Sequence, residues 1–321
     1  MRKIIKTLLG IGGAFCLIGA LLFSIGFTSG GTKYVHDTNL NSMNAQEDNK
    51  ESANRFTLKK TEIPDFTSLN INLEDSDLNI EESPNEKSYI EYAQATKDKK
   101  NPVSYSIENG TLTLKEAGNT GASYYINVDI SFLQAALSSK NIEDYTKESS
   151  KYENYVTLYL PKDKLVSSAK IYLGYGDFYV KNATFDTTNI KLDDGDFDAN
   201  TLTANSGKLT FSYGDCDLQK ASLGNISLTS KDGDLTVNEL TLLGKTKIAL
   251  SYGDAEITLN DSTKKVSGFD LATHYGTITA SGLNGNKTLD EDDDVNTFQS
   301  DSKDGKTKLS IDSKDGDITV K

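Results

Sequence analysis

An aspartate follows a glycine at regular intervals in the second half of the chain, and these carboxylates have the clearest potential for chemistry. The series consists of Asp177, Asp196, Asp215, Asp234, Asp254 and Asp317. If successive Gly-Asp pairs stack, neighbouring carboxylates lie about 5 Å apart and repel by roughly 1 kcal/mol per pair even in water. Either backbone N–H groups at the turn or a bound cation must offset this repulsion.

The turns lack the G-G-x-G-x-D pattern of calcium-binding β-rolls, so we expect backbone N–H groups to satisfy the carboxylates and no cofactor to be required. A functional Ca²⁺ site is the weaker alternative. Its candidate ligands are Asp177, Asp196, Asp215, Asp234 and Asp254.

The residue directly before the turn glycine is either tyrosine or aspartate. The tyrosines are Tyr175, Tyr213, Tyr252 and Tyr275, and the aspartates are Asp194, Asp232 and Asp315. Tyrosine provides contact area with little loss of side-chain entropy, so the four tyrosines are candidate residues for binding a glycan or a protein partner. The simpler interpretation is that each ring covers the backbone of its turn.

No nucleophile–base pair, phosphate-binding loop or metal-ligand spacing accompanies these residues. Two carboxylates about 5 Å apart would suit a retaining glycosidase. The aspartates form a uniform series, however, and no basic residue recurs beside them. His36 lies in a polar segment, His274 lies in a turn, and Cys216 takes a position where other repeats have Phe or Leu, as expected of a core residue. We therefore predict a non-enzymatic protein, with a polysaccharide-active β-helix enzyme as the weaker alternative.

The Gly-Asp pairs belong to an internal repeat. Its turn glycines are Gly176, Gly195, Gly214, Gly233, Gly253, Gly276 and Gly316. Apolar residues stand two and four positions after each glycine and five positions before it, with mainly polar residues between them. This alternation predicts short strands with one buried face that meet at a corner, where glycine accepts positive φ. The period predicts an all-β fold, a single-stranded β-solenoid or β-helix of about 19–23 residues per coil.

The same pattern reaches upstream, where Ser76 and Gly110 stand in the position of the turn glycine. β structure is therefore expected from about Ile63 to the end of the chain. Residues 133–154 break the alternation and are expected to form an inserted loop or short helix. The acidic run 290–294 stands where a turn glycine is missing.

Residues 8–27 carry no charge and follow a short basic segment, residues 2–6. A helix of this length spans about 30 Å, the thickness of a bilayer core, and the basic flank predicts a cytoplasmic N-terminus. Residues 1–31 are thus predicted to be a single membrane anchor; the alternative is a cleaved signal peptide and a secreted protein. Residues 32–62 are polar and are expected to form a flexible tether, which leaves residues 63–321 as the extracytoplasmic domain.

Charge and composition exclude several classes of protein. The chain has 34 basic and 47 acidic residues and a net charge of −13. Nucleic-acid binding needs a basic surface, and an acidic domain is repelled by anionic lipid. Two cysteines and two histidines cannot provide a disulfide framework or several metal sites.

Residues 65–321 resemble the bacterial "putative adhesin" β-strand-repeat family. The resemblance rests on PDFTSLNINLEDSDLNI (residues 64–80), VTLYLPKDKL (residues 156–165) and the succession of G-D-apolar-x-apolar turns. It implies a β-solenoid outside the cell membrane, in some members linked to envelope-stress genes, and it brings no catalytic residues.

Together these features predict a membrane-anchored, extracytoplasmic and adhesin-like interaction module, with an envelope protein or a glycan as its partner. The alternative is an envelope-stress sensor or regulatory scaffold that binds another membrane protein. Recognition is expected on the line of Tyr or Asp turns, or at the strand Ile318–Val320. That strand is expected to form the open edge of the stack, where a partner strand can add.

Overall fold

The structure is a computed structural model that describes residues 54–96, 101–117, 154–290 and 294–321. Contacts group Arg55–Lys321 into one compact unit, which is described by itself. The predicted anchor (1–31) with its span (8–27), and the insertion at 133–154 except for Asn154, lie outside the described residues. Within the described part of the chain, no helix is long and apolar enough to cross a membrane.

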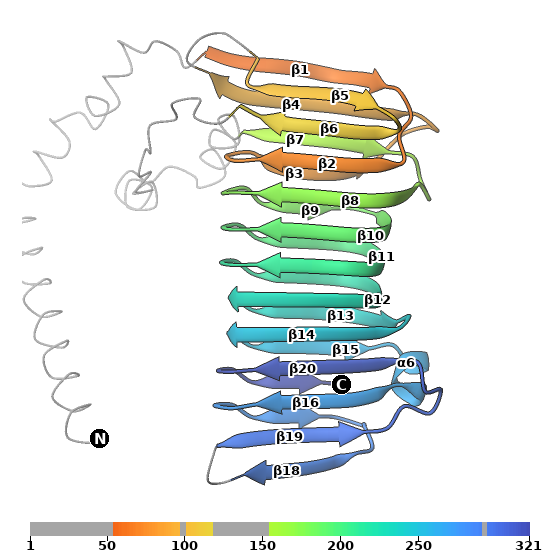
Figure 1. Cartoon of the computed structure of the whole chain (residues 1–321), viewed down its shortest axis with the longest axis vertical. Coiled ribbons are helices and arrows are strands. Elements are labelled where there is room, and N and C mark those ends of the chain that lie inside the picture. The colour runs from red at the N-terminus through yellow and green to blue at the C-terminus, as the bar shows by residue number, and fades with distance from the viewer. Residues whose placement is uncertain (1–53, 97–100, 118–153, 291–293) are drawn as a thin grey trace, which may run out of the picture. The chain divides into compact units, whose positions relative to one another are not determined.

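Nearly all described elements are strands, and most run parallel in two rows, one on each side of the predicted corner (Figure 1). We call the order in which the coils lie along the stack the stack order. In this order the row before the corner consists of β6 (Thr111–Glu116), β2 (Ser68–Leu73), β8 (Leu165–Leu173), β10 (Ala183–Leu192), the ends of β11 (Phe197–Phe211) and β12 (Cys216–Asp232), β14 (Lys245–Tyr252), β20 (Lys308–Ser313) and β16 (Gly268–Thr273). After the corner stand β7 (Tyr155–Leu160), β3 (Asp77–Glu82), β9 (Phe178–Val180), the beginnings of β11 and β12, β13 (Leu235–Leu242), β15 (Ala255–Leu259), β21 (Ile318–Val320) and β17 (Ile278–Ala280). The one helix among the described residues, α6 (Asp261–Val266), follows β15.

The repeat sets the register between coils. Ile190 is the direct partner of Ile171 on one side and of Leu209 on the other, so the position five residues before the corner forms a continuous apolar line. All three side chains are buried, as are Phe178 and Phe197, whose rings stack with centroids 5.0 Å apart. The predicted alternation and the solenoid-like architecture are confirmed.

The order of the coils in space departs from their order in the chain at both ends. The coil of β2 and β3 lies between the β6–β7 and β8–β9 coils. The C-terminal coil of β20 and β21 lies between the β14–β15 and β16–β17 coils. The prediction that Ile318–Val320 forms an open edge is therefore wrong, because β21 pairs with β15 on one side and with β17 on the other.

Antiparallel strands lie at both ends of the parallel stack. At one end β4 (Ser88–Thr96) pairs with β7 and with β1 (Asn54–Ile63), and β5 (Val103–Glu108) pairs with β6. At the other end β19 (Val295–Ser300) pairs with β16 and with β18 (Asn286–Asp290). Such caps limit the exposed edges of the parallel rows.

Two predictions are corrected at the N-terminal cap. The tether was expected to reach residue 62, but β1 begins at Asn54 because Phe56 and Leu58 pack against the core on alternate positions. Gly110 was interpreted as a corner glycine, but Asn109 and Gly110, with φ of 51° and 74°, form the hairpin turn between β5 and β6. Both residues have the positive φ that the tight two-residue turn requires.

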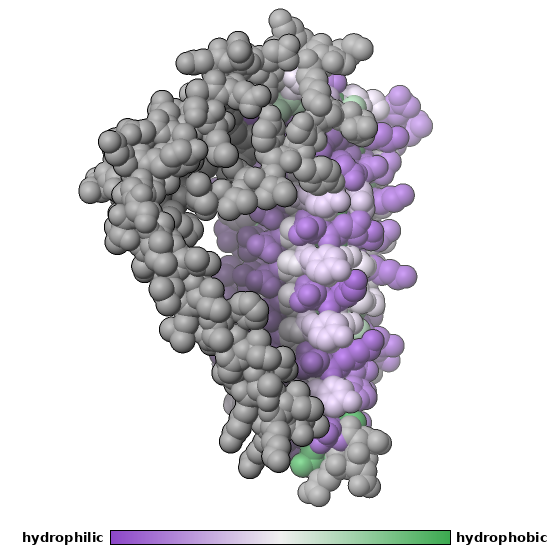
Figure 2. All heavy atoms as spheres, turned by 90° about the vertical axis from the view of Figure 1, so that its left-hand side faces the viewer, coloured by the Kyte–Doolittle hydropathy of each residue, from purple (hydrophilic) through white to green (hydrophobic). Residues whose placement is uncertain are grey.

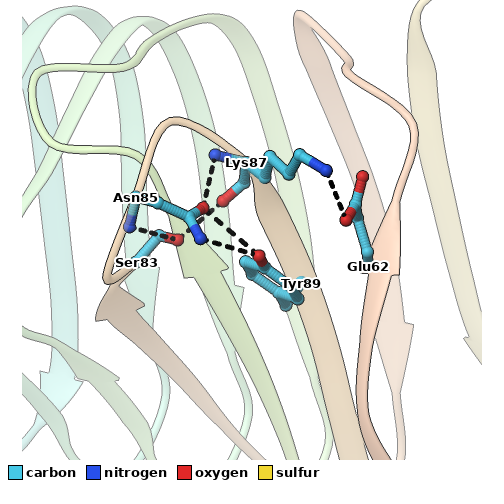
Figure 3. Close-up of polar contacts among 5 residues, drawn as sticks. All are labelled: Glu62, Ser83, Asn85, Lys87 and Tyr89. Atoms are coloured by element: carbon cyan, nitrogen blue, oxygen red, sulfur yellow. Dashed lines mark hydrogen bonds and ion pairs between the residues drawn. The ribbon is translucent and has the colours of Figure 1, made fainter.

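The turn between β3 and β4 leads the chain from the parallel coils into this cap (Figure 3). The Ser83 hydroxyl donates to the carbonyl of Lys87 over 2.6 Å, and the N–H of Lys87 donates to the Asn85 side chain over 2.9 Å. The Asn85 amide lies 2.9 Å from the Tyr89 hydroxyl, and the Lys87 ammonium lies 2.8 Å from Glu62. These contacts fix the reversal of direction and connect it to β1.

Candidate functional site

The corner is a column of glycine residues in very close contact. A Cβ atom on Gly233 would lie 2.0 Å from the carbonyl oxygen of Gly214, and one on Gly276 would lie 2.0 Å from that of Gly316. Five of the turn glycines also have φ between +114° and +145°; these are Gly195, Gly214, Gly233, Gly253 and Gly316. The corner therefore requires glycine mainly because successive backbones approach so closely, and at five turns also because φ is positive.

Each aspartate after the corner accepts a hydrogen bond from the backbone of the next coil. The acceptors in stack order are Asp77, Asp177, Asp196, Asp215, Asp234, Asp254 and Asp317, each with Oδ1 2.7–2.9 Å from the next backbone nitrogen. The last donor is the N–H of Thr277 in the final coil of the stack, where threonine takes the place of the aspartate. The prediction that backbone N–H groups satisfy the carboxylates is confirmed. Asp77, which follows a serine, is a member that the glycine pattern did not identify.

Calcium binding by these aspartates stays a prediction. Within the part of the chain that the structure describes, no group of three or more His, Cys, Asp or Glu side chains is arranged to hold a metal ion. One oxygen of each carboxylate is already engaged by an N–H group, so a cation would bind the other oxygen at the exposed side.

We expect Asp215→Ala to lower the free energy of unfolding by about 1–2 kcal/mol, because the N–H of Asp234 loses its acceptor. Asp215→Asn keeps an acceptor oxygen and removes one charge from the series, so it should stay within about 0.5 kcal/mol of the wild type. Urea unfolding of both variants measures the difference, and equal losses would contradict the capping role.

A separate experiment tests calcium binding by the aspartates. An unchanged melting temperature in millimolar Ca²⁺ would contradict a calcium site.

The residue directly before the corner glycine alternates strictly between aspartate and tyrosine when the turns are taken in stack order. In chain order Tyr252 and Tyr275 are consecutive, but the inserted C-terminal coil places Asp315 between them. Among the described residues the series, which we name the Tyr–Asp column, is Asp75, Tyr175, Asp194, Tyr213, Asp232, Tyr252, Asp315 and Tyr275. Tyrosine therefore recurs on every second coil.

The four tyrosines of the column are strongly exposed. The exposed fractions are 56% for Tyr175, 48% for Tyr213, 58% for Tyr252 and 70% for Tyr275. They account for half of the eight exposed large hydrophobic residues in the described part of the chain, so exposed aromatic surface is concentrated at the corner. Figure 2 shows this edge, where pale groups alternate with purple ones in a nearly straight column.

Fixed polar contacts surround the column. The ammonium of Lys231 donates to the Tyr213 hydroxyl over 3.0 Å and lies 4.9 Å from the centre of its ring. Lys191 lies 2.6 Å from Asp193 and lowers the pKa of that carboxyl. The Tyr172 hydroxyl donates to Asp193 over 2.9 Å, which raises the pKa of Tyr172 to about 12. Tyr172 is therefore neutral and Asp193 ionised at physiological pH.

Glu116 caps the first turn of the column. Its carboxylate accepts the N–H groups of Glu74 and Asp75 over 2.7 and 2.9 Å. Burial raises the pKa of Glu116 despite these hydrogen bonds. Sequence reasoning missed this role, because Glu116 ends β6 and lies 40 residues from Ser76 in the chain.

Two titratable groups near the corner have pKa values raised by burial. Cys216 is buried in the line of Phe197 and Leu235, as predicted for a core residue, and burial raises the pKa of its thiol. Burial, and then the charge of Asp217 beside it in the register, raises the pKa of Asp198. His274 lies at the surface with Nε2 3.8 Å from Asp312. His36 lies outside the described residues.

Comparison with known proteins gives a family match over most of the chain. Residues 66–321 match the family described as Toastrack DUF4097. No curated protein gives a significant match.

Several solved structures are similar over most of their length. A "putative cell adhesion protein" from Clostridium sporogenes is 14% identical, with 83% of this chain and 98% of that chain covered and a TM-score of 0.35. A "putative adhesin" from Bacteroides fragilis is 13% identical, with 84% and 97% covered and a TM-score of 0.40. A "Putative lipid binding protein" from Parabacteroides distasonis is 13% identical, with 84% and 97% covered and a TM-score of 0.31. At these TM-scores the likeness carries no functional conclusion.

Proposed function

We propose that this chain, which belongs to the Toastrack DUF4097 family, is an adhesin-like binding module displayed outside the cell membrane. The family membership agrees with the resemblance to the "putative adhesin" β-strand repeats. The observation that carries the proposal is the Tyr–Asp column, in which exposed rings recur on every second coil of a rigid corner. Binding surfaces built on regular elements hold their side chains more precisely than surfaces built on loops.

The hydrogen bonding of the corner supports binding over catalysis. In the Asp series each Oδ1 accepts an N–H group of the next coil, and the environment of one carboxylate repeats that of the next. A retaining glycosidase needs one carboxyl kept as an acid and a second kept as a nucleophile, which requires unlike environments. The polysaccharide-active enzyme is therefore the weakest of the alternatives.

We further propose that residues 8–27 anchor the protein in the cell membrane with a cytoplasmic N-terminus. The absence of charge over this span and the basic residues before it support the proposal. Protease added to intact cells should then remove a tag placed after Lys321. Retention of the tag would contradict this orientation, and release of the tagged domain into the medium would indicate a cleaved signal peptide.

The second candidate function is an envelope-stress sensor or scaffold that binds another membrane protein. The structure offers β18 for this role, since its pairing among the described strands is with β19 alone. An open edge of this kind can accept a strand from a partner.

The two functions differ in what the full chain binds. An adhesin-like module, purified in mild detergent, should sediment with insoluble cell-wall polysaccharide. A regulator should instead crosslink in cells to a membrane protein, and this product should disappear when residues 1–31 are deleted. Failure of both assays would overturn the proposed binding function.

A further inference from the structure

We propose that the Tyr–Asp column binds an extended β-1,4-linked glycan that carries no net negative charge. This inference rests on the proposed binding function and adds the chemical class of the ligand. The residues that carry it are the four exposed tyrosines and the aspartates between them.

The spacing of the rings selects an extended glycan. Neighbouring parallel strands lie about 4.8 Å apart, so tyrosines on alternate coils lie roughly 10 Å apart. In an extended β-1,4-linked chain successive pyranose rings are flipped, so alternate sugars present the same face at nearly this interval. A single chain that runs along the stack can therefore place one sugar on each tyrosine. From Tyr175 to Tyr275 the column has room for about six or seven sugars.

The chemistry of the column suits a neutral carbohydrate. A tyrosine ring offers an apolar face to the C–H groups of a pyranose, and its hydroxyl hydrogen-bonds to the rim of the sugar. The aspartates of the column are acceptors for the hydroxyl groups of the intervening sugars. The adjacent Asp series adds further negative charge along the corner and repels a polyanionic glycan.

The corner is organised before a ligand binds. Each turn is held by an Asp carboxylate of the neighbouring coil, and glycine lets the turns stack in direct contact. A rigid surface loses little conformational entropy on binding. Because the column is nearly straight, it fits an extended chain and excludes an α-linked glucan, which coils (Figure 2).

The test uses the full chain in mild detergent and calorimetric titration with defined oligosaccharides. Cello- and chito-oligosaccharides should bind, with affinity that rises with length up to about six or seven sugars. Malto-oligosaccharides, which are α-linked, and oligomannuronates, which are β-1,4-linked but anionic, should not bind. Insoluble cellulose and chitin, both neutral, are compared in sedimentation and distinguish a glucan from an N-acetylglucosamine polymer as the source.

Substitutions in the column test its role directly. Tyr213→Ala and Tyr252→Ala should each weaken binding by about tenfold, while the corresponding Phe variants keep the ring and most of the affinity. The double change Tyr213→Asp with Asp232→Tyr keeps the composition and charge but breaks the two-coil spacing. It should also weaken binding by about tenfold. All of these side chains are exposed, so the variants should have the melting temperature of the wild type, which would confirm that they fold.

The results can overturn the inference in three ways. Full affinity in the exchanged variant would show that spacing does not matter. Binding that survives both alanine substitutions would place the glycan elsewhere. A wild-type protein that binds no neutral glycan, yet still sediments with insoluble cell-wall polysaccharide, would overturn this inference and leave the proposed adhesin-like function standing.

Discussion

Gly233→Ala is expected to lower the free energy of unfolding by about 3–5 kcal/mol, a large part of the stability of an ordinary domain. The added Cβ would lie 2.0 Å from the carbonyl oxygen of Gly214, and φ at this residue is +126°. Backbone strain in this region amounts to about 1–3 kcal/mol, and forced separation of packed groups adds a similar amount. Urea unfolding monitored by circular dichroism measures the loss.

Gly305→Ala provides the matched control. Gly305 also has positive φ, at +65°, but nothing lies within 4 Å of an added Cβ. Its replacement should lower stability by only about 1 kcal/mol, because the conformation is the sole penalty. A loss at Gly233 no larger than the loss at Gly305 would contradict the role of close backbone approach at the corner.

The register of the solenoid could be predicted because burial acts on each residue locally. The apolar residues two positions after the corner, such as Phe197 and Leu235, had to face inward once the corner was placed. The capping by aspartate was also predictable, since a stack of carboxylates needs donors and the turn backbone supplies them. Two local patterns indicate the N-terminal cap: the Asn-Gly pair at 109–110 is typical of a hairpin, and Phe56 and Leu58 alternate as in a strand.

The order of the coils could not be predicted, because every coil offers its neighbours similar apolar positions. Ile248 pairs with Ile311, and Ile311 pairs with Leu271, although Leu271 precedes Ile311 in the chain. Any of these residues would fit beside another. The strict alternation of tyrosine and aspartate was hidden for the same reason, since it exists only in stack order.

Deletion of residues 308–321 is expected to unfold the C-terminal end of the stack. The deletion removes β20 and β21, which separate the β14–β15 coil from the β16–β17 coil and pair with both. It removes four buried apolar side chains, each worth roughly 1.5–3 kcal/mol, and exposes their neighbours on two sides. These side chains are Leu309, Ile311, Ile318 and Val320. Hydrogen exchange should show lost protection in β16 and β17, with β10 to β12 still protected; stacking in chain order would instead leave β16 and β17 intact.

Paired cysteines test the same insertion without removing any part of the core. Glu256 on β15 is the register partner of Thr319 on β21, whose other partner is Thr279 on β17. Glu256→Cys with Thr319→Cys should form a disulfide, whereas Glu256→Cys with Thr279→Cys should not, because two strand spacings, about 10 Å, exceed the reach of a disulfide. Cys216 is buried and does not compete, and Cys16→Ser removes the other thiol. Crosslinking of the second pair alone would mean stacking in chain order; Tyr252 and Tyr275 would then be adjacent, and the two-coil spacing on which glycan binding depends would be lost.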